Sequence, residues 1–189
     1  MVERAKEQEK EELLAQVKTL WPFEGKRFSV KKETLHLPRN RTRVRETVVH
    51  TAAVVLIPLL NKEKILFIQQ YRRAAGKILI ELPAGVLEEG DTLKERAQKE
   101  LQEETGYRAK ELITFGGIFS TPGFCTEYLH FFLAKDLKLS PLPADEDEAI
   151  DLLPLSLKKA LSLIDSNEIS DAKTLVGVLK YARLLRTTK

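Results

Sequence analysis

A predicted helix in the middle of the chain carries acidic residues on the side that its sequence marks for burial. The segment TLKERAQKELQEETG, read at 3.6 residues per turn, places Leu93, Ala97 and Leu101 along one apolar stripe. The same geometry places Glu100 and Glu104 within about 20° of the first of these residues, one turn apart and inside or beside the stripe. Two carboxylates in such a position are candidates for binding a cation.

The position of these two acids is costly without a cation. Like charges one turn apart destabilise even an exposed helix by a few tenths of a kcal/mol, and partial burial adds several kcal/mol for each ion. A divalent cation such as Mg²⁺ resolves the conflict, because it accepts hard oxygen ligands. Glu103, at the edge of the stripe, either joins the cluster or pairs with Arg96. The competing interpretation is a solvated acidic helix end whose apolar stripe is displaced by one turn.

The amino-acid composition argues against nucleic-acid binding, disulfides and metal sites built from Cys or His. Among 189 residues, 31 Lys and Arg against 28 Asp and Glu give a net charge of +3, too small for a dedicated nucleic-acid binder. The single cysteine, Cys125, cannot form an internal disulfide, and the three histidines lack the spacing of metal ligands. A metal site would therefore be built from oxygens.

The N-terminus has no apolar targeting region, and no stretch approaches the roughly 18 to 20 apolar residues of a membrane span. We expect a cytoplasmic protein with no membrane partner.

Strands and helices around the acidic helix predict an α+β fold. Short apolar runs and turn residues predict strands at 52–60, 65–70, 78–82, 112–119 and 127–134. Further helices are predicted near 156–164 and 171–186, and Gly106 ends the acidic helix. Because strands and helices do not alternate as in a doubly wound parallel fold, we expect an α/β/α sandwich: a mixed sheet with helices on both faces.

The N-terminal part of the chain predicts a separate, β-rich region. Apolar spacing predicts a helix over residues 3–20, and alternation predicts a strand from 28 to 37 with a turn at 38–40. Residues 26–45 contain eight basic residues and one acid. This basic run is either a solvated strand face or a surface that faces an anion or a partner subunit. The predicted organisation is a helical extension (1–20), N-terminal strands (21–48) and a larger domain (49–189).

The stretch 85–107 resembles the box of the Nudix hydrolase superfamily, G-x5-E-x7-R-E-U-x-E-E-x-G-U, where U is a bulky apolar residue. It departs from this pattern twice. Asp91 replaces a glutamate, and Lys99 replaces an arginine, which keeps the charge but loses the planar fork that binds a carboxylate at two points. The resemblance implies the Nudix fold and hydrolysis of a diphosphate linked to another group.

The resemblance also implies a metal site and a general base. In the superfamily, Mg²⁺ ions polarise the phosphate and orient the attacking water, and Mn²⁺ is the alternative ion here. The implied ligands are Ala84 through its carbonyl, Glu100, Glu103 and Glu104. The base is usually a glutamate on a loop after the box, and the acidic run 144–148 is the candidate, with Glu148 favoured and Glu146 close behind. The competing interpretation of that run is a solvated acidic turn.

Shorter motifs resemble the ADP-ribose pyrophosphatase subfamily. They are Gln70-Tyr71-Arg72, the ELPAG stretch at 81–85, the STPGF stretch at 120–124 and Glu168-Ile169-Ser170-Asp171-Ala172. This resemblance implies hydrolysis of ADP-ribose to AMP and ribose 5-phosphate. The alternatives are a pyrophosphohydrolase for another nucleotide sugar or a dinucleotide, and a nucleotide-binding module that does not hydrolyse, which the two departures from the box motivate.

The same resemblance implies substrate-binding residues and a partner subunit. Arg45 and Arg72 would bind the diphosphate, since guanidinium groups offer bidentate donors to phosphate. Phe28, or alternatively Trp21, would stack on adenine, although ordinary packing explains either aromatic residue equally well. Members of the subfamily are commonly homodimers in which the N-terminal strands reach into the second subunit. The other implied contacts to this small-molecule substrate are Glu46, Gly123 and Phe124.

Overall fold

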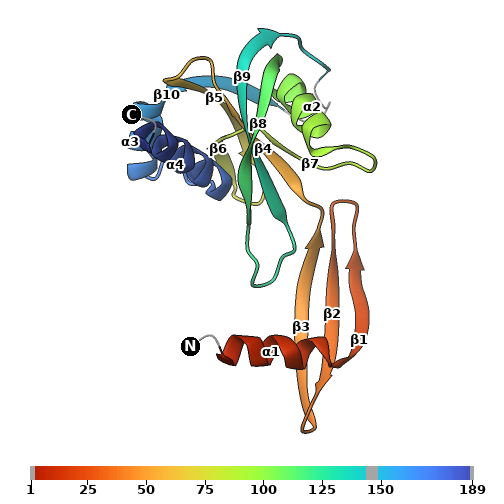
Figure 1. The fold of residues 1–189 in the computed structure, drawn as a ribbon. Coiled ribbons are helices and arrows are strands. Elements are labelled where there is room, and N and C mark those ends of the chain that lie inside the picture. The colour runs from red at the N-terminus through yellow and green to blue at the C-terminus, as the bar shows by residue number, and fades with distance from the viewer. Residues whose placement is uncertain (1–2, 144–148, 188–189) are drawn as a thin grey trace. The chain divides into compact units, whose positions relative to one another are not determined.

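The structure is a computed structural model that describes residues 3–143 and 149–187, and the chain divides into two units (Figure 1). The larger unit comprises residues 52–120 and 128–189, and the smaller comprises residues 1–51 and 121–127. The loop segment 121–127 therefore belongs with the N-terminal residues, although a long stretch of chain separates them.

The larger unit is built around a mixed four-stranded sheet of β4 (Ala53–Pro58), β7 (Ala84–Val86), β8 (Tyr107–Phe119) and β9 (Tyr128–Leu139). These strands stand in the order β7-β4-β9-β8, with β4 and β9 parallel and the other pairs antiparallel. Strand β4 is apolar and buried along its whole length. Both faces of the sheet must therefore be covered.

Helices cover the two faces of this sheet. They are α2 (Leu93–Thr105) on one face, and α3 (Leu157–Asp165) and α4 (Ala172–Thr187) on the other (Figure 1). Since successive side chains of a strand point to opposite faces, Val54 and Leu56 of β4 pack in the core with α2, whereas Val55 and Ile57 pack in the core with α3 and α4. The predicted α+β architecture is confirmed.

A second sheet in the larger unit consists of β5 (Lys64–Arg72), β6 (Lys77–Glu81) and β10 (Ile150–Ser156). It is antiparallel, in the order β10-β5-β6, and Ile65 and Phe67 of β5 are buried in the core shared with α3 and α4. The sequence predicted strands at 65–70 and 78–82 but placed them in one sheet with the others. Which strands share a sheet is decided by hydrogen bonds between strands that are distant in the sequence, and an apolar run does not indicate its partners.

The smaller unit contains α1 (Glu3–Leu13) and an antiparallel sheet of β1 (Gln16–Glu24), β2 (Phe28–Leu37) and β3 (Arg41–His50), in the order β1-β2-β3. The strand at 28–37 and the turn at 38–40 are confirmed. In that turn Arg39 and Asn40 adopt left-handed φ angles of 61° and 57°.

The helix predicted over residues 3–20 is wrong beyond Leu13. Residues 16–24 form β1, which pairs with β2 from Gln16 opposite His36 onward. Val17 and Leu20 satisfy helical spacing, but β-branched and aromatic residues around Trp21 also suit a strand, and the neighbouring strand β2 supplies the hydrogen-bond partners that decide between them. Among the residues that the structure describes, no helix is long and apolar enough to cross a membrane.

Candidate active site

Helix α2 is fixed at both ends by caps, of which the sequence analysis predicted the one at Gly106. The Thr92 hydroxyl accepts the Glu95 N–H (3.3 Å), and the Glu95 carboxylate accepts the Thr92 N–H (3.0 Å), which completes a capping box. Gly106 ends the helix with φ 75°, and its N–H donates to the Gln102 carbonyl (3.0 Å). These caps fix the helix ends and help to hold its register, which decides the side chains that are buried.

The buried face of α2 carries two acids at the positions that periodicity predicted. Ala97 and Leu101 are fully buried, and Glu100 and Glu104 are only 5% and 7% exposed. Glu103 is half-buried. The predicted burial is confirmed, and a solvated helix end is excluded for Glu100 and Glu104.

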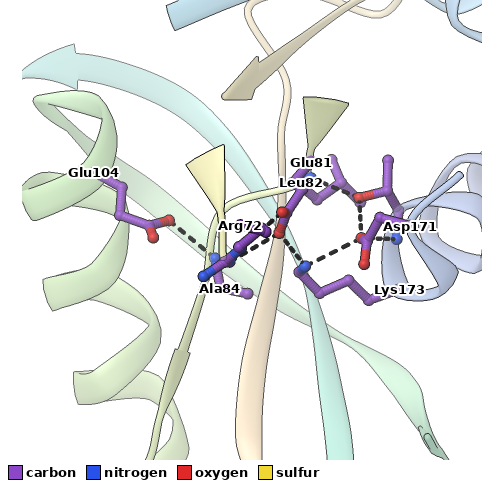
Figure 2. A network of polar contacts seen from close by, with 8 residues as sticks. Arg72, Glu81, Leu82, Ala84, Glu104, Asp171 and Lys173 are labelled. Carbon is purple, nitrogen blue, oxygen red and sulfur yellow. Dashed lines mark hydrogen bonds and ion pairs between the residues drawn. The ribbon is translucent and has the colours of Figure 1, made fainter. Parts of the chain in front are cut away.

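The two buried acids lie against consecutive backbone positions at the start of β7. Glu104 accepts a hydrogen bond from the Ala84 N–H (2.9 Å), as Figure 2 shows. Glu100 lies against the next residue, since a Cβ on Gly85 would come within 1.5 Å of Glu100 Oε1. Any side chain at position 85 would displace that carboxylate. The Ala84–Gly85 backbone therefore forms one wall of the acidic site.

Arg96 supplies positive charge to this site from the same helix. Its guanidinium is paired with Glu100, one turn further along, and with Glu88 in the loop before α2 (Nη1 to Oε1, 2.9 Å). Burial lowers the pKa of Arg96, but the negative charges of Glu100 and Glu88 outweigh burial and leave the pKa above its usual value. Glu100, rather than Glu103, is thus the glutamate of the box that pairs with Arg96.

The two departures from the box contact each other. Lys99 Nζ lies 3.4 Å from Asp91 Oδ1. The Lys99 side chain is 46% exposed and that of Asp91 15%. An aspartate with a lysine therefore retains an ion pair between α2 and the loop that precedes it, without the two parallel bonds that an arginine would make.

A third buried acid, Glu81, lies at the end of β6 beside this site (Figure 2). Arg72 Nε and Nη2 donate to its two carboxylate oxygens, both at 2.8 Å. Lys173 of α4 also pairs with Glu81 and lies 3.1 Å from Asp171 Oδ2. Glu81 is 1% exposed, so its charge is balanced by cations from two other elements.

The pKa of Arg72 depends on Glu81 and on Glu104 of the box. Hydrogen bonds to Glu81 raise the pKa of Arg72, and the charges of Glu104 and Asp171 add to this effect. For Glu81, burial raises the pKa, but the hydrogen bonds from Arg72 and the charge of Lys173 outweigh it and leave the pKa below its usual value. Arg72 therefore stays charged, and its bonds to Glu81 use two of its five N–H donors.

Sequence reasoning did not assign three of these residues to the site: Glu81, Asp171 and Lys173. One signal for Glu81 was available, since an acid that ends the apolar strand ILIE must be buried and paired. Its partner Lys173 follows it by more than 90 residues, and no local pattern could have identified that contact.

The donors at this site suit the divalent ion that the Nudix resemblance implies. Glu100, Glu104 and the Ala84 carbonyl offer only oxygen, which hard cations such as Mg²⁺ prefer. Within residues 3–143 and 149–187, no three Asp, Glu, His or Cys side chains are already gathered as a metal cluster. The donor chemistry therefore fits a divalent ion. The coordination is only partly preformed, because Glu103 is not gathered with Glu100 and Glu104, and those two acids already contact Arg96 and the Ala84 N–H.

The remaining residues predicted to bind substrate belong to the smaller unit, and its arginines have acidic partners there. Arg45 is paired with Glu12 of α1 (2.5 Å), as is Arg43 (3.2 Å), and Arg41 is paired with Glu11. The basic run thus has an internal acidic partner that sequence reasoning did not foresee.

The other residues of this group are exposed. Glu46 pairs with Lys32 (3.0 Å), and the Phe28 ring packs 5.3 Å from that of Phe23. Gly123 is exposed, and Phe124 is 57% exposed and accepts a backbone hydrogen bond from Val48. The structure therefore gathers Arg72, Ala84 and the box glutamates in one unit and these residues in the other. Glu146 and Glu148, the candidate bases, lie outside the described residues.

Comparisons with known proteins agree with the resemblance of residues 85–107 to the Nudix box. Residues 49–175 match the family model described as the NUDIX domain. The chain is 37% identical over 175 residues to the methanol dehydrogenase activator of Bacillus methanolicus, covering 92% of this chain and 94% of that protein. It is 36% identical over 164 residues to the ADP-ribose pyrophosphatase of Bacillus subtilis, covering 86% and 88%.

A solved structure has the same fold. The crystal structure of an ADP compounds hydrolase superposes with a TM-score of 0.82, at 19% identity, and covers 92% of this chain and 95% of that one. At this identity the likeness supports the fold alone. The match to the family model over most of the chain, with Glu100 and Glu104 of the box buried on α2, identifies this chain as a member of the Nudix hydrolase family.

Proposed function

We propose that this protein hydrolyses the diphosphate bond of ADP-ribose to AMP and ribose 5-phosphate, using Mg²⁺. The observation that carries the proposal is the pair of buried carboxylates, Glu100 and Glu104, held against the Ala84–Gly85 backbone. The choice of substrate is supported by the 36% identity to an ADP-ribose pyrophosphatase over most of both chains and by the motifs around Arg72 and Gly123.

The reaction adds one water across the P–O–P linkage. The water oxygen bonds to one phosphorus, the bond from that phosphorus to the bridging oxygen breaks, and the other phosphate leaves with the bridging oxygen. A base must take the proton from the water, and we assign this role to Glu148, with Glu146 as the alternative. The divalent ions, when bound, neutralise charge on the phosphate oxygens and lower the pKa of the attacking water.

The chain's own residues bind and orient the reactants. Glu100, Glu103, Glu104 and the Ala84 carbonyl would hold the ions. Arg72, with three N–H donors left after its bonds to Glu81, would bind the diphosphate, and the resemblance to the subfamily assigns a diphosphate contact to Arg45 as well. Contacts to the rest of the substrate are assigned to Glu46, Gly123, Phe124 and Phe28.

A substrate panel with a metal titration tests this function. Initial rates on ADP-ribose, ADP-glucose, GDP-mannose and NADH are measured with Mg²⁺ and with Mn²⁺, and the products are identified. We expect ADP-ribose to be preferred, with AMP and ribose 5-phosphate in equal amounts. A preference for a sugar nucleotide without adenine would overturn the substrate assignment. Tight binding of ADP-ribose by calorimetry, with no cleavage under either metal, would establish the non-hydrolysing module instead.

We also propose that the protein is a cytoplasmic homodimer that uses its N-terminal strands as an interface. The smaller unit exposes several large apolar side chains, and exposed apolar surface is typical of protein contacts. They are Leu13, Leu14, Val17, Leu20, Trp21, Phe23, Phe28, Val44 and Phe124. Light scattering coupled to size exclusion measures the mass directly, and a mass of one chain at micromolar concentration would contradict the proposal.

A further inference from the structure

The first turn of α4 is hydrogen-bonded to the strand end that leads to Ala84. The Thr174 hydroxyl accepts the Leu82 N–H (2.8 Å) and donates to Asp171 Oδ2 (2.6 Å), which also accepts the Thr174 N–H (3.0 Å). Thr174 and Leu82 are both completely buried. Water therefore cannot replace this hydroxyl, and the Leu82 N–H depends on it.

The same helix turn also holds the residue before Leu82. Lys173 bridges Asp171 and the Glu81 carboxylate, and Arg72 binds that carboxylate from β5 (Figure 2). The side chain of Glu81 and the backbone of Leu82 are thus both attached to α4 or to side chains that contact it.

Close packing between α4 and Leu82 is a second, independent sign of this attachment. A Cβ on Gly177, one turn beyond Thr174, would lie 2.4 Å from Leu82 Cδ1. Only glycine at this position lets the helix approach so closely. On the opposite side, Glu104 of α2 accepts the Ala84 N–H. The turn from Glu81 to Ala84 is therefore held by α4 on one side and by an acid of the box on the other.

We propose that Thr174, with Asp171 and Lys173, is a positioning group that fixes the Glu81–Ala84 turn and thereby sets the affinity of the site for a divalent ion. This inference rests on the proposed function, because it takes the Ala84 carbonyl as an ion ligand. It gives a role to the Glu168–Ala172 motif, which the reaction itself does not use.

The test replaces Thr174 by valine, which has nearly the same shape but no hydroxyl. Binding of Mn²⁺ alone is measured by calorimetry, and kcat and KM are measured separately on the preferred substrate. We expect Thr174→Val to weaken Mn²⁺ binding about tenfold, the size of effect for one buried hydrogen bond, and to lower kcat more than it changes KM. Thr174→Ser, which restores the hydroxyl, should restore the Mn²⁺ affinity.

Tyr181→Phe is the matched control. Tyr181 is a buried residue of the same helix, and its hydroxyl also donates to a backbone group, the Lys62 carbonyl (3.0 Å), at a place away from the Glu81–Ala84 turn. This variant should lose stability without any change in Mn²⁺ affinity.

The outcomes separate the inference from the proposed function. If Thr174→Val folds and binds Mn²⁺ as tightly as the parent, the inference is wrong although the proposed function stands. If the parent itself binds no Mn²⁺ or Mg²⁺, the proposed function fails first. Should Thr174→Val not fold, Asp171→Asn gives the answer, because it removes charge from the half-buried partner of Thr174. The inference then requires weaker Mn²⁺ binding in Asp171→Asn, and parent affinity would overturn it.

Discussion

Glu81 and the pair Glu100 and Glu104 are all buried acids, but the protein holds them in different ways. Glu81 is bound by Arg72 from β5 and Lys173 from α4, so its charge is balanced by elements far apart in the chain. Glu100 pairs with an arginine of its own helix, and Glu104 accepts a backbone N–H. We conclude that Glu81 joins parts of the fold together, whereas the acids of α2 are positioned by their own helix and by the Ala84–Gly85 backbone.

The largest effect in this comparison is expected from Glu104→Gln. The substitution keeps an oxygen that can accept the Ala84 N–H but removes the charge that binds the ion, so kcat should fall by about a thousandfold, or about 4 kcal/mol of transition-state stabilisation. The melting temperature without metal should stay close to that of the parent. Steady-state kinetics and thermal unfolding measure the two quantities. Parent-like turnover would show that the metal assignment is wrong.

Glu81→Gln should instead lower stability more than it lowers turnover. It removes one partner of a buried ion pair and leaves Arg72 and Lys173 without their shared acid, which typically costs about 3 to 5 kcal/mol of unfolding free energy. Urea unfolding measures this change. The matched control is Glu111→Gln, because Glu111 pairs with Lys135 on the surface (3.8 Å, 55% and 41% exposed) and should contribute less than about 1 kcal/mol. A loss at Glu81 no larger than at Glu111 would contradict the contrast drawn above.

How much of this contrast the sequence could predict depends on how local each contact is. Helical periodicity placed Glu100 and Glu104 correctly, and Gly106 predicted the C-terminal end of the helix, since each signal lies within a few residues. Glu81 and Lys173 meet only because two sheets and α4 pack together, so no local pattern predicts their pairing.

The same reasoning explains the error at the N-terminus. Leu13, Leu14, Val17 and Leu20 fit a helical stripe, and a rule based on spacing alone extends the helix through all of them. Pairing of β1 with β2 overrides that local preference beyond Leu13. Local spacing therefore predicts positions on an element reliably only where the element type is already certain.

The pH dependence of the unfolding free energy offers a third way to test the contrast between Glu81 and the acids of α2. The pKa of Glu81 is lowered in the folded protein, below about 4.3 for a glutamate in an unfolded chain. Its contribution is therefore fully present above that pH and is lost as the pH falls through the folded-state pKa. The gap in unfolding free energy between the parent and Glu81→Gln should stay constant from about pH 8 to about pH 5 and narrow toward pH 3. A gap that widened with acid would mean that burial, rather than Arg72 and Lys173, dominates the pKa.

The smallest effect is expected from the pair formed by the two departures from the box. Lys99 and Asp91 lie 3.4 Å apart, and the lysine is half-exposed, so the pair gains little from its Coulomb energy in a solvated setting. A double-mutant cycle with Asp91→Asn and Lys99→Met should give a coupling energy below about 1 kcal/mol in urea unfolding. Lys99→Arg, which restores the fork of the box, should change kcat/KM by less than about threefold, because Glu100 already has Arg96 as its cation. A coupling above about 2 kcal/mol would place this pair with the buried network of Glu81 instead, and the two departures would then have to be regarded as a change in how α2 is anchored to its loop.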